Sequence, residues 1–107
     1  MNFVTQNLVA PFGLPAAYLY RVNRFSEDVQ QYGVEACGAE ALPFGRRGLR
    51  LTLCSGTNEF MATLERDRVK LELIRLDGQR VPLAEGGAAS QTTWDRFVQV
   101  VREMEDK

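Results

Sequence analysis

The stretch LRLTLCSGTNEFMATLERDRVKLELIRLDGQRVPL, residues 49–83, decides the fold, because its apolar residues follow the two-residue repeat of half-buried strands. The apolar positions of the first three runs are Leu49, Leu51, Leu53, Phe60, Ala62, Leu64, Val69, Leu71 and Leu73. If Arg66-Asp67 forms a two-residue turn, Leu64 faces Val69 and all of these side chains share one face of a sheet. We therefore predict an antiparallel meander of four strands over residues 49–83.

The fourth strand follows Asp77-Gly78, a strong hairpin signal because glycine accepts a positive φ. It contains Pro82, which has no amide hydrogen for a ladder and therefore belongs at an edge of the sheet. A two-residue turn here places Ile74 opposite Val81, on the face away from Leu71. Either a bulge restores the apolar phase or this second face is also partly covered, and we favour the second explanation.

The clearest helix is predicted at residues 92–105, where apolar side chains recur at helical spacing. Thr92 and Asp95, three residues apart, match a capping box at its start. The apolar stripe of this amphipathic helix should lie across one face of the sheet.

The N-terminal half is less regular. Residues 1–16 read as an arm or a short strand, and residues 18–25 alternate like a strand that would pair beside Leu49. Ser26 is a candidate N-cap for a short helix, whereas residues 34–42 are not assigned. The predicted fold is α+β. A single antiparallel sheet of about five strands, the meander plus an N-terminal strand, carries the C-terminal helix on one face.

The chain of 107 residues is expected to form one domain, residues 1–107. Its formal net charge of −1 argues weakly against a nucleic-acid or membrane binder driven by electrostatics. We expect no signal peptide and no membrane span, and therefore a small soluble domain in the reducing cytoplasm. Cys37 and Cys54 are interpreted as two buried thiols rather than a disulfide. Residues 85–89, which contain two glycines, are expected to form a flexible crossover.

The chain has no histidine, the commonest general base and a frequent metal ligand. Two cysteines alone do not complete a tetrahedral zinc site, and no phosphate, dinucleotide or calcium loop motif is present. We therefore predict no catalytic residues, no metal and no cofactor, and we expect that the protein is not an enzyme.

The densest basic cluster gives a candidate nucleic-acid contact made of Phe44, Arg46, Arg47 and Arg50. The order of strands, a glycine hairpin and a closing helix with a tryptophan near its start is similar to the layout of small single-stranded-DNA-binding domains of the positive-cofactor type. That resemblance implies binding of single strands along a basic strand surface. Acidic residues interrupt this surface here, so a solvated arginine loop is the favoured interpretation.

The leading hypothesis is a non-catalytic interaction module that binds a protein partner or itself through a sheet face or edge. The candidate interface residues are Met61, Ile74, Leu76 and Val81, whose apolar side chains the register places on the second face. A homodimer or a protein partner would cover them, and residues 1–15 are the competing cover. Single-stranded nucleic-acid binding is the first alternative, and a small-molecule pocket between helix and sheet is the second.

Overall fold

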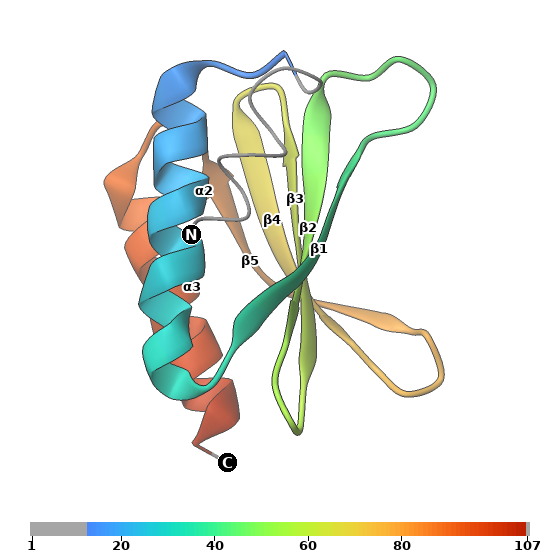
Figure 1. The fold of residues 1–107 in the computed structure, drawn as a ribbon, viewed down its shortest axis with the longest axis vertical. Coiled ribbons are helices and arrows are strands. Elements are labelled where there is room, and N and C mark those ends of the chain that lie inside the picture. The colour runs from blue at the N-terminus through green and yellow to red at the C-terminus, as the bar shows by residue number, and fades with distance from the viewer. Residues whose placement is uncertain (1–12, 107) are drawn as a thin grey trace.

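The computed structural model describes residues 13–106. Its elements, in chain order, are α2 (Ala16–Asp28), the 3₁₀-helix η1 (Val29–Tyr32), β1 (Glu35–Ala41), β2 (Gly48–Cys54), β3 (Glu59–Glu65), β4 (Arg68–Ile74), β5 (Arg80–Gly87) and α3 (Gln91–Glu105). The five strands form one antiparallel sheet in the order β1-β2-β3-β4-β5. Both long helices pack on the same face of this sheet (Figure 1). The predicted α+β class with a five-stranded sheet is confirmed.

The predicted register between β3 and β4 is confirmed. Leu64 pairs with Val69 and Phe60 with Leu73, across the two-residue turn at Arg66-Asp67. The leucines of β2 lie opposite the apolar residues of β3 in the same way. Because side chains alternate between the faces of a strand, this register gathers the apolar residues of β2, β3 and β4 toward the helices.

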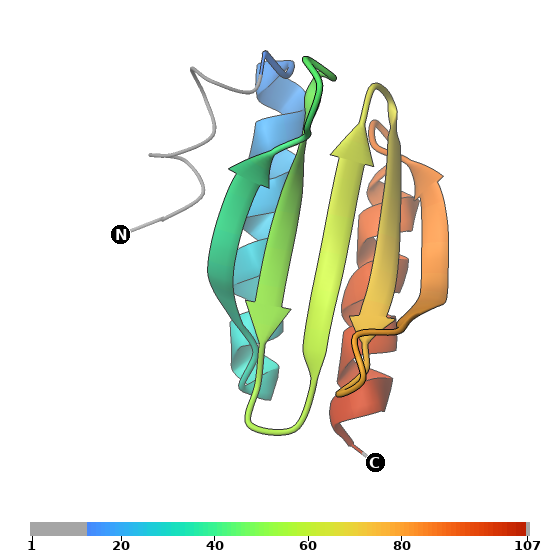
Figure 2. The same ribbon diagram turned by 90° about the vertical axis from the view of Figure 1, so that its right-hand side faces the viewer.

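The helices bury their apolar stripes against this face. In Figure 2, α2 lies behind β1 and β2, and α3 lies behind β4 and β5. Phe25 of α2 meets Trp94 and Phe97 of α3, with ring centroids 5.7–6.0 Å apart. The Trp94 indole N–H donates to the carbonyl oxygen of Ala88 at 2.8 Å, so its one polar atom is satisfied inside the core.

Three predictions that concern the helices are corrected. Residues 18–25 form part of α2 rather than a strand, because Leu19, Val22 and Phe25 are buried at helical spacing. Ser26 lies inside this helix and does not cap it. The C-terminal helix is confirmed, but it begins at Gln91 and has no side-chain cap, so the predicted capping box is wrong.

The fifth strand is β1, which lies within the unassigned residues 34–42. It pairs with β2 and contains a bulge between Ala36 and Gly38. The bulged residue, Cys37, forms a disulfide with Cys54 of β2, with a Cα–Cα distance of 6.0 Å. The prediction of two free thiols is therefore wrong, because the pairing of β1 brings the two residues together. Residues 1–12 of the arm predicted at residues 1–16 lie outside the described residues, and Ala16 is the first residue of α2.

Reduction of the Cys37–Cys54 disulfide should lower the free energy of unfolding by about 2–3 kcal/mol, because an intact bridge restricts the unfolded chain. The two cysteines are 17 residues apart. Urea unfolding with and without a reductant measures the effect. A variant with both cysteines replaced by serine should not respond to the reductant. Equal midpoints for the wild-type protein in both conditions would contradict the bridge.

The pairing of β4 with β5 differs from the prediction by one residue. Arg75 pairs with Gln79 rather than Arg80, so three residues form the loop, and Gly78 takes a φ of 86° there. Ile74 then pairs with Arg80, and Val81 pairs with Leu73 on the helix side. A bulge is also present in β5, between the partners of Leu71 and Glu72. This agrees with the explanation that a bulge restores the apolar phase, rather than with the covered second face that we favoured.

Strand β5 continues through Gly86 and Gly87, so the predicted flexible crossover over residues 85–89 is largely wrong. A Cβ on Gly86 would lie 2.5 Å from the Thr93 hydroxyl oxygen. The glycine therefore allows α3 to pack closely against the end of the strand.

Candidate protein interface

The face of the sheet away from α2 and α3 is covered by neither helix, and we call it the open face. Figure 2 looks directly onto it. The strand registers arrange its side chains in rows that run across the sheet. One row consists of Glu40, Arg50, Thr63, Lys70 and Glu85. The next row toward the β2–β3 turn consists of Gly38, Thr52, Met61, Glu72 and Pro82.

The first of these rows, the charged row, has acidic residues at both ends and a cation on each side of Thr63. A shallow hollow of about 340 Å³ lies over it and over neighbouring charged residues. Arg50 contacts Glu40 at 3.5 Å, and Arg68 contacts Glu85 at 4.0 Å. Such half-exposed pairs contribute little stability, so the charges remain free to meet a partner.

Arg50 is the most enclosed cation of the charged row. Its side chain is only 24% exposed, and its Nε atom is buried without a hydrogen-bond partner in the described part of the chain. A buried N–H without an acceptor costs free energy. The guanidinium of Arg50 is therefore short of an acceptor.

The second row begins the apolar end of the open face, which consists of Met61, Ile74, Pro82, Leu76 and the Cys37–Cys54 disulfide. Met61 and Ile74 are half-buried by their strand neighbours, whereas Pro82 is exposed. Glu72 lies among them but is only 8% exposed, and its carboxylate contacts the Lys70 ammonium at 3.6 Å. Its charge is thereby compensated, and the exposed charges of this end lie in the next row, at Glu35, Glu59 and Arg80.

Leu76 is fully exposed at the tip of the β4–β5 loop. The loop has a defined backbone, because Arg75 N–H donates to the Gln79 carbonyl at 2.8 Å and Gly78 N–H to the Arg75 carbonyl at 2.9 Å. The Asp77 carboxylate accepts the Gln79 N–H at 2.9 Å. A leucine held in water by an ordered loop is a good candidate contact for a partner.

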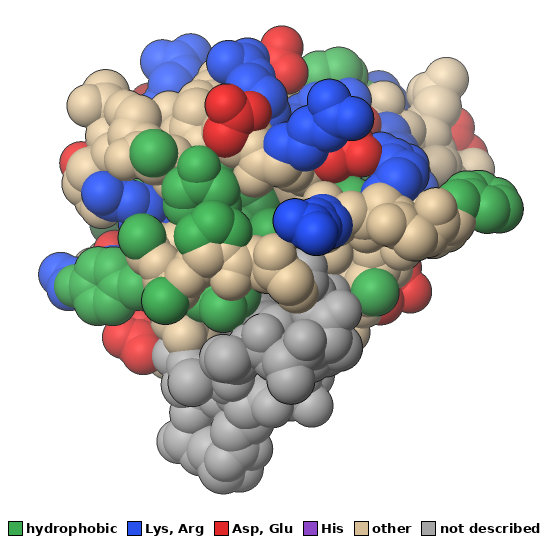
Figure 3. Space-filling view, turned by 90° about the horizontal axis from the view of Figure 1, so that it is seen from above, with side chains coloured by type: hydrophobic (Ala, Val, Ile, Leu, Met, Phe, Trp, Pro, Cys, Tyr) green, Lys and Arg blue, Asp and Glu red, His purple; other side chains and the backbone are tan. Residues whose placement is uncertain are grey.

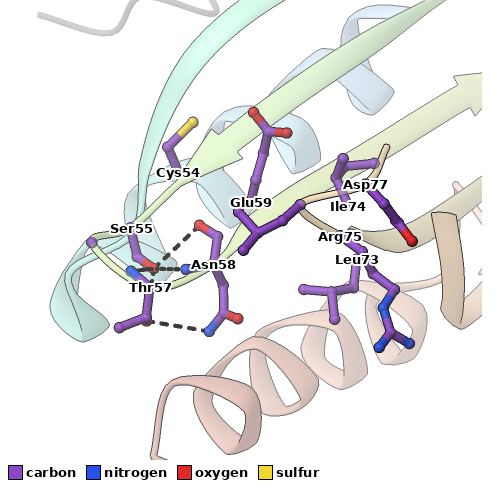
Figure 4. A pocket seen from close by; sticks show the side chains of 11 residues that line it. Cys54, Ser55, Thr57, Asn58, Glu59, Leu73, Ile74, Arg75 and Asp77 are labelled. Atoms are coloured by element: carbon purple, nitrogen blue, oxygen red, sulfur yellow. Dashed lines mark hydrogen bonds between the residues drawn. The ribbon is translucent and has the colours of Figure 1, made fainter. Parts of the chain in front are cut away.

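An open hollow of about 760 Å³ separates this loop from the β2–β3 turn. In Figure 4, Cys54, Glu59 and Ile74 point to the side opposite α3, whereas Leu73 points toward that helix. The hollow is thus continuous with the apolar end of the open face.

The other wall of this hollow is the β2–β3 turn, which is anchored to α3. The Ser55 hydroxyl accepts the Asn58 N–H at 2.9 Å and donates to the Glu105 carboxylate at 2.9 Å. Asn58 donates its side-chain amide to the same carboxylate at 2.6 Å. These contacts connect the turn to the last turn of the helix, so this wall is preorganised.

The predicted nucleic-acid residues are only partly brought together. Phe44 lies in the β1–β2 loop, 96% exposed, with a φ of 61°. Arg46 makes a bidentate ion pair with Glu65 at 2.5 Å, and its hydrogen bonds lower the pKa of that carboxyl. Seen from above, Lys and Arg side chains gather on the sheet side of this end, with acidic ones among them (Figure 3).

Arg50 is separate from this loop, in the charged row, where it contacts Glu40. Of the three predicted arginines, only Arg47 makes no ion pair within the described residues. Affinity for nucleic acid grows with the number of phosphates that Lys and Arg neutralise. A single arginine without an ion pair therefore gives little support for a nucleic-acid site.

Of the predicted protein-interface residues, Met61, Ile74 and Leu76 lie together at the apolar end. Val81 does not, because the three-residue loop turns it toward the helices, beside Leu73. Sequence reasoning missed the disulfide, because it did not predict the pairing of β1 with β2 that brings Cys37 and Cys54 together. It also left Pro82 out of the interface, because its side depends on the β4–β5 register.

No protein-family model matches this sequence, and no curated protein or solved structure is significantly similar to it. Among residues 13–106, no three histidine, cysteine, aspartate or glutamate side chains cluster as a metal site would require. No helix in that range is long and apolar enough to cross a membrane. The open face is therefore interpreted on its own geometry.

Proposed function

We propose that this protein is a non-catalytic interaction module that binds a protein through the open face of its sheet. The observation that carries the proposal is the one-sided architecture. Both helices pack on one face, and the other presents an apolar end next to a charged row. Protein interfaces combine such an apolar centre with a polar rim.

Two further features support a protein as the ligand. The ordered β4–β5 loop holds Leu76 fully exposed beside the hollow, where a partner could bury it. The layer between helices and sheet is filled by large buried side chains such as Phe60, Leu71 and Phe97. A small-molecule site inside that layer therefore receives no support.

The proposal includes the compartment in which the protein acts, which we propose is an oxidising one. A cytoplasmic location was the expectation for a chain with two free thiols, but the Cys37–Cys54 bridge is more typical of an oxidising compartment. The disulfide lies at the same end of the open face as Met61. We therefore expect that the chain binds its partner with this disulfide formed.

A photo-crosslinking amino acid at position 61 should capture the partner in cells that make the protein. Met61 is half-buried at the centre of the open face, whereas Gln99 lies exposed on α3 and provides the matched control position. We expect an adduct of one defined mass from position 61 and none of that mass from position 99. Equal adducts from both positions, or none from position 61, would refute the proposed interface.

A further inference from the structure

We infer that the occupant of the open face is a second copy of this chain, related by a two-fold axis that runs across the strands along the row of Met61. This inference rests on the proposed function and names its partner. The axis would lie in the plane of the interface, so that each strand faces the same strand of the second copy in the opposite direction. The evidence is the order of charges on the face.

The rotation has a definite consequence for each row. The row of Met61 meets itself, so Met61 packs on Met61 of the second copy and Pro82 on Pro82. The charged row meets the row beyond that of Met61, which consists of Glu35, Cys54, Glu59, Ile74 and Arg80. Two sheets packed face to face in this way are a common arrangement in proteins.

Strand β3 then supplies the first charge match. Glu59 of the second copy would lie over Thr63, between the cations Arg50 and Lys70. Neighbouring strands are about 4.8 Å apart, so each cation is one strand away from that carboxylate. The carboxylate would attract the guanidinium of Arg50, whose side chain is 24% exposed. Glu59 itself is exposed and makes no ion pair within the described residues.

Strand β5 supplies the second match. Arg80 of the second copy would lie over Glu85, whose side chain is 63% exposed. Arg80 is exposed and makes no ion pair within the described chain. By symmetry each match occurs twice, so the arrangement contains four complementary contacts. Two kinds of like-charge meeting oppose these contacts. Glu72 on Glu72 is softened because each is buried beside Lys70, and Glu35 on Glu40 is softened because Glu40 contacts Arg50 at 3.5 Å.

The size of the face is close to what a dimer requires. Five strands of about seven residues, with the usual strand spacing and rise, cover roughly 24 by 23 Å. Protruding side chains make the accessible area larger than this flat area. It approaches the roughly 800 Å² that each partner buries in a stable complex.

Sedimentation of the purified, oxidised protein tests the arrangement. We expect a dimer whose dissociation constant rises at least about tenfold for Glu59→Lys, because two carboxylates leave cationic sites and two cations enter them. Arg80→Glu and Glu85→Arg should each weaken the dimer, and the double variant should recover most of the lost affinity. Glu103→Lys and Arg96→Glu on α3 are the matched charge-reversal controls and should leave it unchanged.

The outcomes separate this inference from the proposed function. A monomer at all concentrations would overturn the inference, while a foreign adduct from position 61 would still support the interface. A dimer that tolerates Glu59→Lys, or an Arg80→Glu, Glu85→Arg pair without recovery, would overturn the two-fold arrangement. Circular dichroism of each variant shows that weakened association does not come from unfolding.

Discussion

Replacement of Trp94 by alanine should lower the free energy of unfolding by about 3–5 kcal/mol, as for other large buried aromatic side chains. Trp94 is 2% exposed and contacts the rings of Phe25 and Phe97. Its loss would leave a cavity where α2 and α3 meet and would remove the donor that satisfies the carbonyl of Ala88. Urea unfolding followed by circular dichroism measures the change.

Tyr20 provides the matched control for Trp94. It is an aromatic residue on α2, but it is 62% exposed. Tyr20→Ala should change the stability by about 0.5 kcal/mol or less. If Trp94→Ala were equally mild, the two helices would not depend on the aromatic cluster for their packing.

The sheet could be predicted from the sequence because apolar and polar residues alternate regularly along its central strands. A shift of one residue in β3 or β4 would have moved Leu64 and Val69 to opposite faces, so the apolar pattern determined the pairing. The C-terminal helix could also be predicted from the sequence, since Trp94, Phe97 and Val101 recur at helical spacing. All three are buried in the structure.

The N-terminal helix was missed because two periods overlapped over residues 18–25. Tyr18, Tyr20 and Val22 alternate as in a strand, but Tyr20 is exposed on α2. The residue that distinguishes the two interpretations is Leu19, which is buried in the helix and would have faced away from Val22 in a strand.

The candidate site could be predicted only in part, because it depends on non-local geometry. Met61 and Ile74 followed from the register of β3 and β4. The face of Val81 depended on a loop of three residues rather than two, which Asp77-Gly78 does not specify. The disulfide required the pairing of β1, a strand whose small residues, such as Ala36 and Gly38, give no clear alternation.

Gly48 shows how a residue without an assigned role in the sequence can determine the structure. It precedes the predicted meander of residues 49–83, yet it is the first residue of β2, is buried, and pairs with Glu65. Its φ of 150° lies in a region that residues with a side chain rarely adopt. A Cβ there would lie 2.1 Å from the Leu64 carbonyl oxygen and 2.6 Å from the Leu42 side chain.

Gly48→Ala should therefore lower the free energy of unfolding by at least about 3 kcal/mol, because backbone strain and steric overlap both act at this position. The clash is with the backbone of β3, which cannot move without breaking its pairing with β4. Gly56 is the matched control, since a Cβ there meets nothing within 4 Å. Gly56→Ala should change the urea midpoint only slightly. Similar midpoints for both variants would mean that β2 does not enter the sheet at Gly48, and that the β1–β2 loop and its Arg46–Glu65 pair are arranged differently.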